Sequence, residues 1–168
     1  MMKHRDDLTA EYVRELLDYN PETGVLIWKR GTRRAPKGRI AGCPRPDGRL
    51  SLGIDGHIYL AYRIIWLIQT GHFPVNQIDH IDGDPSNNRW DNLRAATQSQ
   101  NNSNMRTNKV NKSGFNGVSF YKRTGRYVAF IQKNRKTEYL GYFDTAEEAH
   151  EAYCARAKEL HGEFHNPG

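Results

Sequence analysis

The first apolar positions of the chain recur at the spacing of an α-helix. Five residues share one face of this predicted helix: Leu8, Tyr12, Val13, Leu16 and Leu17. Thr9 can cap its start, and Asn20-Pro21 predicts its end. Short apolar runs at 25–29 and 50–54 predict strands, because turn-forming Asp-Gly pairs lie near them. Residues 60–69 are apolar enough to predict a buried helix, which Gly71 ends.

The C-terminal third has a different pattern. Three runs with the character of strands, 117–121, 126–132 and 136–140, are separated by short polar turns. The sequence Thr145-Ala-Glu-Glu148 is a capping box and opens a helix that ends at Gly162. The apolar face of this helix consists of Ala149, Ala152, Tyr153, Ala157 and Leu160. One helix over a three-stranded antiparallel sheet can bury a small core, so we predict an α+β fold class.

A polar, basic stretch at 102–113 separates the two patterns. We therefore predict an N-terminal region at 1–104 with its functional core at about 60–104, a linker at 105–113 and a second domain at 114–164. A mean hydropathy of −0.84 indicates thin cores, which suits small modules better than one large barrel.

The charge of the chain is basic and unevenly distributed. Lys and Arg number 25 against 19 Asp and Glu, which gives a net charge of +6, and no acidic residue occurs between Asn92 and Thr137. A second basic cluster holds one acidic residue, Asp47, among Lys29, Arg30, Arg33, Arg34, Lys37, Arg39, Arg45 and Arg49. Segregated positive charge of this kind favours contact with the phosphates of a nucleic acid over two solvated loops.

Cys43 and Cys154 lie far apart and form no paired motif, which argues against a disulfide framework and a zinc knuckle. The N-terminus lacks the apolar segment of a signal peptide, and the longest apolar run, 60–68, is too short to cross a bilayer and contains Arg63. We expect an intracellular chain without membrane association.

The residues around His80 carry the chemistry. Phosphodiester hydrolysis needs a general base and a cation, and Asp79 and His80 supply a carboxylate and an imidazole at one strand end. The turn residues at 82–87 let the chain double back, so residues 92–95 can pair as a returning strand and 97–104 can form a short helix. Each residue also has an ordinary interpretation, since histidines are often structural and Asn-rich runs are often loops. A calcium loop is disfavoured because the regular ligand spacing and closing Glu are missing.

Asp79-His80, Asn92 and Asn101 follow one another at spacings that resemble the HNH endonucleases of bacteriophages, in the branch whose third residue is Asn. The resemblance implies one divalent metal held by Asp79 and Asn101, with Mg²⁺ favoured over Mn²⁺. It implies His80 as general base and Asn92 as the hydrogen-bond partner that fixes the ring tautomer. Arg94 is a weaker candidate for a phosphate contact. Asn87, Asn88 and Asn102 offer competing amides, between which spacing alone favours Asn92 and Asn101.

The run Tyr139-Leu-Gly-Tyr-Phe-Asp-Thr-Ala-Glu-Glu-Ala149, with the glycines before it, resembles the Apetala/ethylene-response DNA-binding domain. The resemblance implies that the exposed face of the sheet binds the DNA major groove. The resemblance implies five residues of this chain as DNA contacts: Lys122, Arg126, Tyr127, Lys136 and Tyr139. Ser119, Gln132 and Phe130 depart from the residues common in plant members, so the plant target sequence does not transfer.

Together these features predict a homing-type HNH endonuclease that nicks one strand of double-stranded DNA per active site. We expect a monomer that nicks or a homodimer that cuts both strands, in the host bacterial cytoplasm if a phage encodes it. The alternative is a DNA-binding regulator whose HNH unit is vestigial, and it is disfavoured because all four inferred positions carry competent side chains. A zinc-stabilised finger is a distant third, for want of cysteines.

Overall fold

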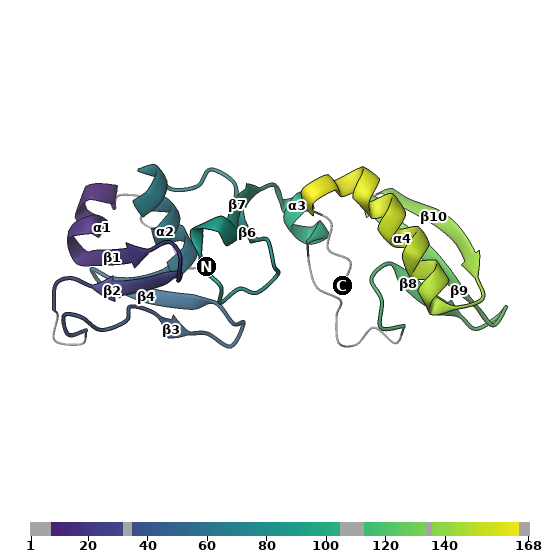
Figure 1. The fold of residues 1–168 in the computed structure, drawn as a ribbon, viewed down its shortest axis with the longest axis horizontal. Coiled ribbons are helices and arrows are strands. Elements are labelled where there is room, and N and C mark those ends of the chain that lie inside the picture. Colours follow the sequence, from purple (N-terminus) through teal and green to yellow (C-terminus); the bar gives the residue numbers. More distant parts are fainter. Residues whose placement is uncertain (1–7, 32–34, 105–112, 134–135, 165–168) are drawn as a thin grey trace. The chain divides into compact units, whose positions relative to one another are not determined.

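The structure is a computed structural model that describes residues 8–31, 35–104, 113–133 and 136–164 (Figure 1). The chain divides into two compact units, Met1–Ala96 and Thr97–Gly168. Most of the predicted linker, 105–113, lies outside the described residues; only Ser113 is described. No helix within the described ranges is both long and apolar enough to cross a membrane.

The first unit alternates short strands with two helices, and its mixed architecture agrees with the predicted α+β class (Figure 1). Its helices are α1 (Ala10–Leu16) and α2 (Ala61–Thr70), and a 3-10 helix spans Trp90–Asn92. Its strands are β1 (Leu17–Asn20), β2 (Val25–Trp28), β3 (Cys43–Pro44), β4 (Leu50–Ile54), β5 (His57–Leu60), β6 (Gln77–His80) and β7 (Leu93–Ala96).

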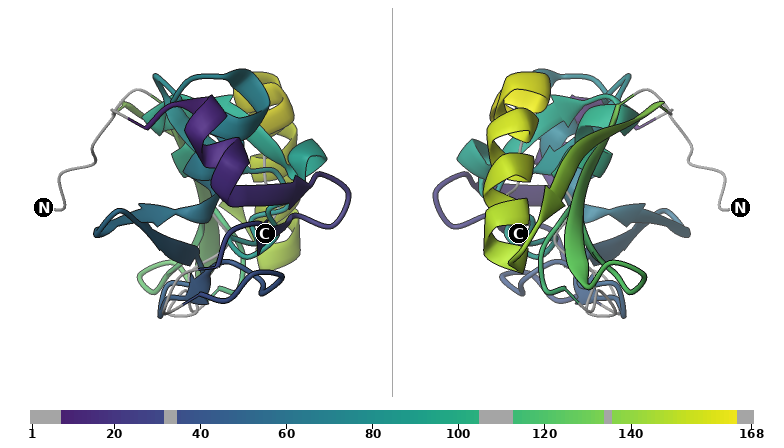
Figure 2. Two further views of the ribbon diagram at one scale, coloured as in Figure 1. Left: turned by 90° about the vertical axis from the view of Figure 1, so that its left-hand side faces the viewer. Right: turned by 90° about the vertical axis from the view of Figure 1, so that its right-hand side faces the viewer.

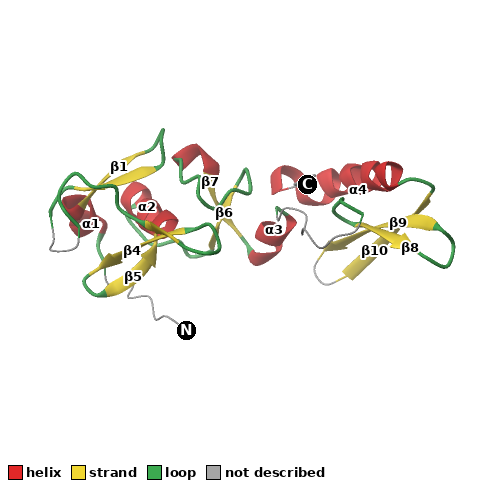
Figure 3. Ribbon diagram, turned by 90° about the horizontal axis from the view of Figure 1, so that it is seen from below, coloured by secondary structure: helices red, strands yellow, loops and turns green. Residues whose placement is uncertain are grey.

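The strands of this unit form three small antiparallel sheets, with the orders β1-β2, β3-β4-β5 and β6-β7. All three sheets contribute to one core, together with α1 and α2 (Figure 3). Ile64 and Ile65 of α2 are fully buried at its centre, beside Val13 of α1. Truncation of a core isoleucine to alanine costs about 2–5 kcal/mol in general, so the loss of either side chain would destabilise this unit.

The first helix is shorter than its apolar spacing predicts. Thr9 caps it as expected, since its hydroxyl accepts a hydrogen bond from the Tyr12 N–H, but the helix ends at Leu16. Leu17 then begins β1 and pairs with Trp28, so that Leu17 and Tyr19 point inward by strand alternation. The prediction that the helix continues to Asn20-Pro21 was wrong because pairing with β2 satisfies the backbone from Leu17 onward.

The second unit begins with the short helix α3 (Gln98–Ser103). A three-stranded antiparallel sheet of order β10-β9-β8 follows, with β8 at Val118–Tyr121, β9 at Arg126–Lys133 and β10 at Lys136–Phe143. Helix α4 (Ala146–His161) lies along one face of this sheet, as the right-hand view of Figure 2 shows. The capping box of Thr145 and Glu148 is present, and Ala149 of the helix is buried against Val118 and Ala129 of the sheet.

Candidate active site and DNA-binding face

The candidate active site of the first unit is built on the hairpin of β6 and β7. The antiparallel register sets Asp79 opposite Arg94 and His80 opposite Leu93. Asp79 is 3 % exposed, and one of its carboxylate oxygens lies 2.8 Å from both Nε and Nη2 of Arg94. A buried carboxylate needs such compensation, so the arginine holds the Asp79 charge at the end of the strand.

His80 is the last residue of β6 and is 8 % exposed. Neighbouring residues of a strand point to opposite faces. Asp79 therefore contacts Arg94 on one face, and the His80 ring packs edge-on against Tyr62 of α2 on the other, with 5.3 Å between the ring centroids. Its Nε2 lies 3.2 Å from Oδ1 of Asn88. When Nε2–H donates to that amide oxygen, the neutral ring carries its lone pair on Nδ1.

The environment of His80 favours the neutral ring. Burial is the main reason that the pKa of His80 lies below its ordinary value, and the positive charge of Arg49 acts in the same direction. The bond to Asn88 and the carboxylates of Asp82 and Asp79 oppose this lowering of the pKa. A neutral imidazole is the form that can accept a proton from water.

Asn92 has other contacts than those expected from its spacing. Its Oδ1 accepts from the Asp82 N–H at 3.0 Å, and its Nδ2 donates to the Asp82 carboxylate at 3.0 Å and to the Asn87 carbonyl at 2.8 Å. These bonds occupy the amide of Asn92 within the loop between β6 and β7. The expected contact between Asn92 and the His80 ring is therefore replaced by one from Asn88, an amide that spacing had not selected.

The loop between β6 and β7 is further fixed by Asp82. Burial alone would raise the pKa of Asp82, but hydrogen bonds from the Asp84 N–H and from the amides of Asn87 and Asn92 outweigh it, and the net pKa is lowered. The Asn87 Nδ2 donates to the Asp82 carboxylate at 2.7 Å. The carboxylate of Asp82 thus stabilises the fold of the loop that carries Asn88.

Two contacts with the N-terminal hairpin hold Asn88 in place. The Tyr19 hydroxyl of β1 donates to the Asn88 carbonyl at 2.9 Å, and burial raises the pKa of this tyrosine to about 12. Gly24, in the turn between β1 and β2, approaches so closely that a Cβ there would lie 2.6 Å from the Asn88 carbonyl carbon. The sequence pattern gave no sign of these contacts, which join positions more than sixty residues apart.

The expected metal ligands fall in both units. Asp79 lies on β6 of the first unit, whereas Asn101 lies in α3 of the second. Within the described residues, no group of three or more His, Cys, Asp or Glu side chains is placed to hold a metal ion. Asp79 offers a buried carboxylate and Asn101 an amide, and oxygen atoms of both kinds are donors that a hard cation prefers.

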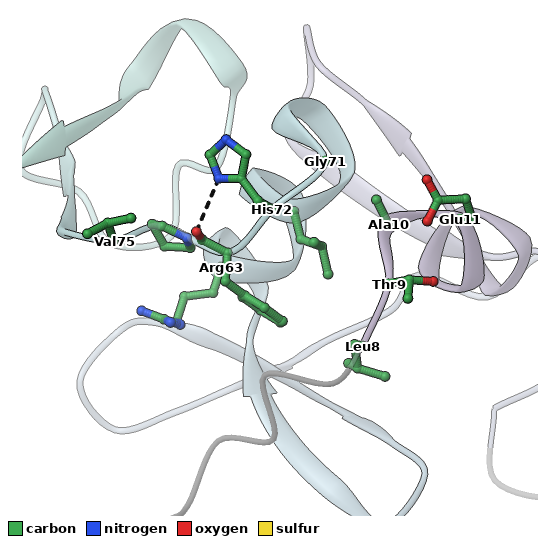
Figure 4. A pocket seen from close by; sticks show the side chains of 11 residues that line it. Leu8, Thr9, Ala10, Glu11, Arg63, Gly71, His72 and Val75 are labelled. Atoms are coloured by element: carbon green, nitrogen blue, oxygen red, sulfur yellow. Dashed lines mark hydrogen bonds between the residues drawn. The ribbon is translucent and has the colours of Figure 1, made fainter.

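A separate hollow in the first unit, of about 530 Å³, lies between the start of α1 and the segment after α2 (Figure 4). Arg63 lines it, and the guanidinium of this residue stacks over the Phe73 ring at 5.7 Å. His72 also lines it, and its Nδ1 lies 3.2 Å from the Phe73 carbonyl oxygen (Figure 4). None of the candidate nuclease residues lines this hollow.

The sheet of the second unit has a face that α4 does not cover. Strand pairing places Tyr139 opposite Phe130 and Tyr142 opposite Val128, on the side away from the buried Ala129 and Ile131. Arg126 lies opposite Tyr121 on this same open face. Tyr139 is 75 % exposed, and the rings of Tyr121 and Tyr142 lie 5.8 Å apart. The open face therefore carries several aromatic rings, and sequence reasoning missed Tyr121 and Tyr142.

The other expected DNA contacts have different positions. Lys122 lies in the turn between β8 and β9, and Lys136 begins β10. Tyr127 pairs with Phe120 and Phe143 and packs against the cluster under α4, so it lies on the covered face. Arg126 Nε donates to the Asp144 carboxylate at 2.8 Å, which orients its guanidinium.

The first unit carries a paired strand-strand hairpin that ends in Asp79-His80, and the second unit carries a three-stranded sheet packed on one helix. Residues 59–103 match the HNH endonuclease family, and residues 113–163 match the AP2 domain. The chain therefore belongs to the HNH endonuclease family and carries an AP2 domain after its nuclease segment.

Known relatives match the two parts of the chain. Protein 3.8 of Escherichia phage T7 is 37 % identical over 101 residues, which are 60 % of this chain and 83 % of that protein. An uncharacterized HNH endonuclease of Acanthamoeba polyphaga mimivirus is 37 % identical over 113 residues, 67 % of this chain and 58 % of that protein. An AP2-like ethylene-responsive transcription factor of Arabidopsis thaliana is 46 % identical over 50 residues, 30 % of this chain and 10 % of that protein. No solved structure matches the chain.

Proposed function

We propose that this protein is a divalent-metal-dependent endonuclease that nicks one strand of double-stranded DNA at each active site. His80 is the general base, and Asp79 with Asn101 would hold the metal ion. The observation that carries the proposal is the buried His80 ring, which Tyr62 and Asn88 fix beside the Asp79–Arg94 pair at the end of β6.

Each side chain has a definite part in this proposal. The lone pair on the His80 ring takes a proton from water as the water oxygen attacks the scissile phosphorus, and the bond from phosphorus to the leaving sugar oxygen breaks. A bound divalent metal would supply a Lewis acid for the phosphate and the leaving oxygen, and Mg²⁺ suits the oxygen donors best. Arg94 keeps a positive charge beside Asp79 and is a candidate for a phosphate contact. Asn92 acts through the loop, whose fold it stabilises around Asn88.

The C-terminal unit would anchor the enzyme on DNA through the open face of its sheet. Arg126 and Tyr139 lie on that face, while Lys122 and Lys136 are exposed beside it. Tyr127 would support this face from the covered side, because its ring packs under α4. The absence of acidic residues between Asn92 and Thr137 favours phosphate contact along the same unit.

The finer biological setting is also a proposal. The relative from a phage supports action on DNA in the bacterial cytoplasm, and the AP2 domain supports a preferred site of the homing type. One active site hydrolyses one bond, so a monomer would nick and a homodimer would cut both strands.

Relaxation of supercoiled plasmid tests the proposed activity. We expect nicked circles with Mg²⁺ or Mn²⁺, none with chelator, and a loss of at least about a hundredfold in rate in His80→Ala, because general bases contribute about 10²–10⁴-fold. DNA binding by His80→Ala should stay within about threefold of wild type. Wild-type protein that binds DNA but does not nick with either metal would support the regulator with a vestigial HNH unit instead.

A further inference from the structure

The hairpin of β3 and β4 lies next to the candidate active site, although it precedes the segment that matches the HNH family. Its turn contains Gly48, with φ of +81°, and a Cβ on this glycine would lie 3.0 Å from Cγ of Pro85. Pro85 belongs to the loop between β6 and β7 that carries Asn88. The tip of the hairpin is therefore in contact with the loop that positions His80.

Two arginines flank this turn. Arg45 and Arg49 are joined across the hairpin by the bond from the Arg45 N–H to the Arg49 carbonyl at 2.8 Å. Asp47 lies between them, 3.6 Å from Nε of Arg45 and 3.3 Å from Nη1 of Arg49. The two arginine side chains are 39 % and 45 % exposed. One carboxylate cannot neutralise two guanidinium groups, so the tip of the hairpin keeps a net positive charge that solvent and solutes can reach.

The charges of this turn reach the surroundings of His80. Burial raises the pKa of Tyr62, the residue that packs on His80, and the charges of Arg49, Arg63 and Arg45 oppose that rise. The positive charge of Arg49 thus acts on the residue that packs against the His80 ring.

Asp47 keeps both guanidinium groups in place. The pKa of Asp47 is lowered, first by the hydrogen bond from the Arg49 N–H and then by the charges of Arg49 and Arg45. The carboxylate therefore stays ionised at neutral pH. An arginine oriented in this way can form two parallel hydrogen bonds to a phosphate, with less loss of side-chain freedom than a mobile one.

We propose that Arg49, with Arg45 beside it, binds a backbone phosphate of the DNA next to the bond that is cut, so that the N-terminal hairpin forms part of the nuclease site. This inference rests on the proposed function of His80. The competing explanation is that Asp47 and its two arginines only stabilise the turn, as exposed ion pairs commonly do to a small extent.

The experiment compares Arg49→Gln with Arg14→Gln in the full chain. Arg14 is a matched control, because it is an exposed arginine of the same unit whose guanidinium is also held by a hydrogen bond, to the Ile68 carbonyl, and it belongs to neither basic cluster. Binding of each variant to a linear duplex is measured in chelator over a range of salt concentrations. Single-turnover nicking is then measured with Mg²⁺ at saturating DNA, and thermal melting reports the fold.

For Arg49→Gln we expect the plot of log affinity against log salt concentration to become less steep by about one unit of slope, which corresponds to the loss of one phosphate contact. Nicking should fall by about tenfold or more, with the melting curve unchanged, and Arg49→Lys should recover part of both losses. Arg14→Gln should behave as wild type. A wild-type salt slope and nicking rate in Arg49→Gln would overturn the proposal, as would equal losses in both variants.

The two proposals fail in different ways. If wild-type protein does not nick, the assignment of His80 fails, and the salt slope of binding still decides whether Arg49 contacts a phosphate. If His80→Ala abolishes nicking and Arg49→Gln changes neither readout, the nuclease stands and the role of the hairpin is overturned.

Discussion

Asn88 is a polar loop residue that is only 2 % exposed, and hydrogen bonds at both ends of its amide offset the cost of burying it. Its Oδ1 contacts Nε2 of His80, and its Nδ2 donates to the Ser86 carbonyl at 3.3 Å. Its own carbonyl accepts from Tyr19. Asn88 therefore has little freedom to move, and the orientation of the His80 ring depends on it.

Replacement of Asn88 by alanine should remove the bond that selects the ring tautomer of His80. We expect single-turnover nicking to fall by about tenfold to a hundredfold, in line with the loss of a residue that orients a catalytic or metal-binding group. The nitrogen chemical shifts of the His80 ring, measured by NMR, should show a mixture of the two tautomers instead of one. Unchanged shifts and rate would contradict the positioning role.

Asn92→Ala is the matched comparison, since it removes an amide from the same loop. Its three hydrogen bonds all lie within the loop, so the expected effect is a loss of about 1–3 kcal/mol in the free energy of unfolding. Nicking by Asn92→Ala should fall only at temperatures at which its melting curve shows unfolding, and it should return to the wild-type rate at lower temperature. The loss in Asn88→Ala should persist at every temperature at which the protein is folded.

The elements around His80 differ in how well the sequence predicts them. Alternation and turn residues are local, so the strand end at Asp79-His80 and the returning strand, seen at Leu93–Ala96, could be predicted within a residue or two. The sequence could not predict that Asn88 and not Asn92 bonds to the His80 ring, because the position of Asn88 depends on Tyr19, 69 residues away in the chain. The switch from α1 to β1 was missed for the same physical reason: distant pairing outweighed local helical spacing.

Gly24 shows how the turn between β1 and β2 supports the active-site loop. Its φ of +74° favours glycine, and a Cβ would lie 2.6 and 2.7 Å from backbone atoms of Asn88 and Arg89. Gly24→Ala should therefore cost clearly more than the roughly 1 kcal/mol of the backbone conformation alone, because backbone must move. We expect a lower melting temperature and slower nicking, since Asn88 is displaced.

Gly56→Ala provides the control. Gly56 has a similar φ of +78°, but nothing lies within 4 Å of its added Cβ. Gly56→Ala should lower the free energy of unfolding, measured with denaturant, by no more than about 1 kcal/mol. Nicking by the folded protein should be unchanged. If the two variants lost equal stability and activity, the close approach to Asn88 would have no structural importance.

At the scale of the whole molecule, each unit has its own hydrophobic core, and the two clusters share no residue. The proposed chemistry depends on His80 and Asp79 in the first unit, and the proposed DNA anchor depends on the open sheet face of the second. Changes in groups that share no partner are generally additive in free energy. Binding and chemistry should therefore be separable by substitution.

Arg126→Ala tests this separation, with Arg156→Ala as control. Both arginines bond to carboxylates, of Asp144 and Glu138 respectively, but Arg126 lies on the open face of the sheet, whereas Arg156 is on α4. Loss of Arg126 should weaken duplex binding by about 1–3 kcal/mol, the range for a direct arginine contact, while Arg156→Ala should bind within about threefold of wild type. Both variants should nick at the wild-type single-turnover rate once DNA is saturating, because neither residue belongs to the unit that carries His80. A lower saturated rate in Arg126→Ala would mean that the sheet face takes part in catalysis as well as in anchoring.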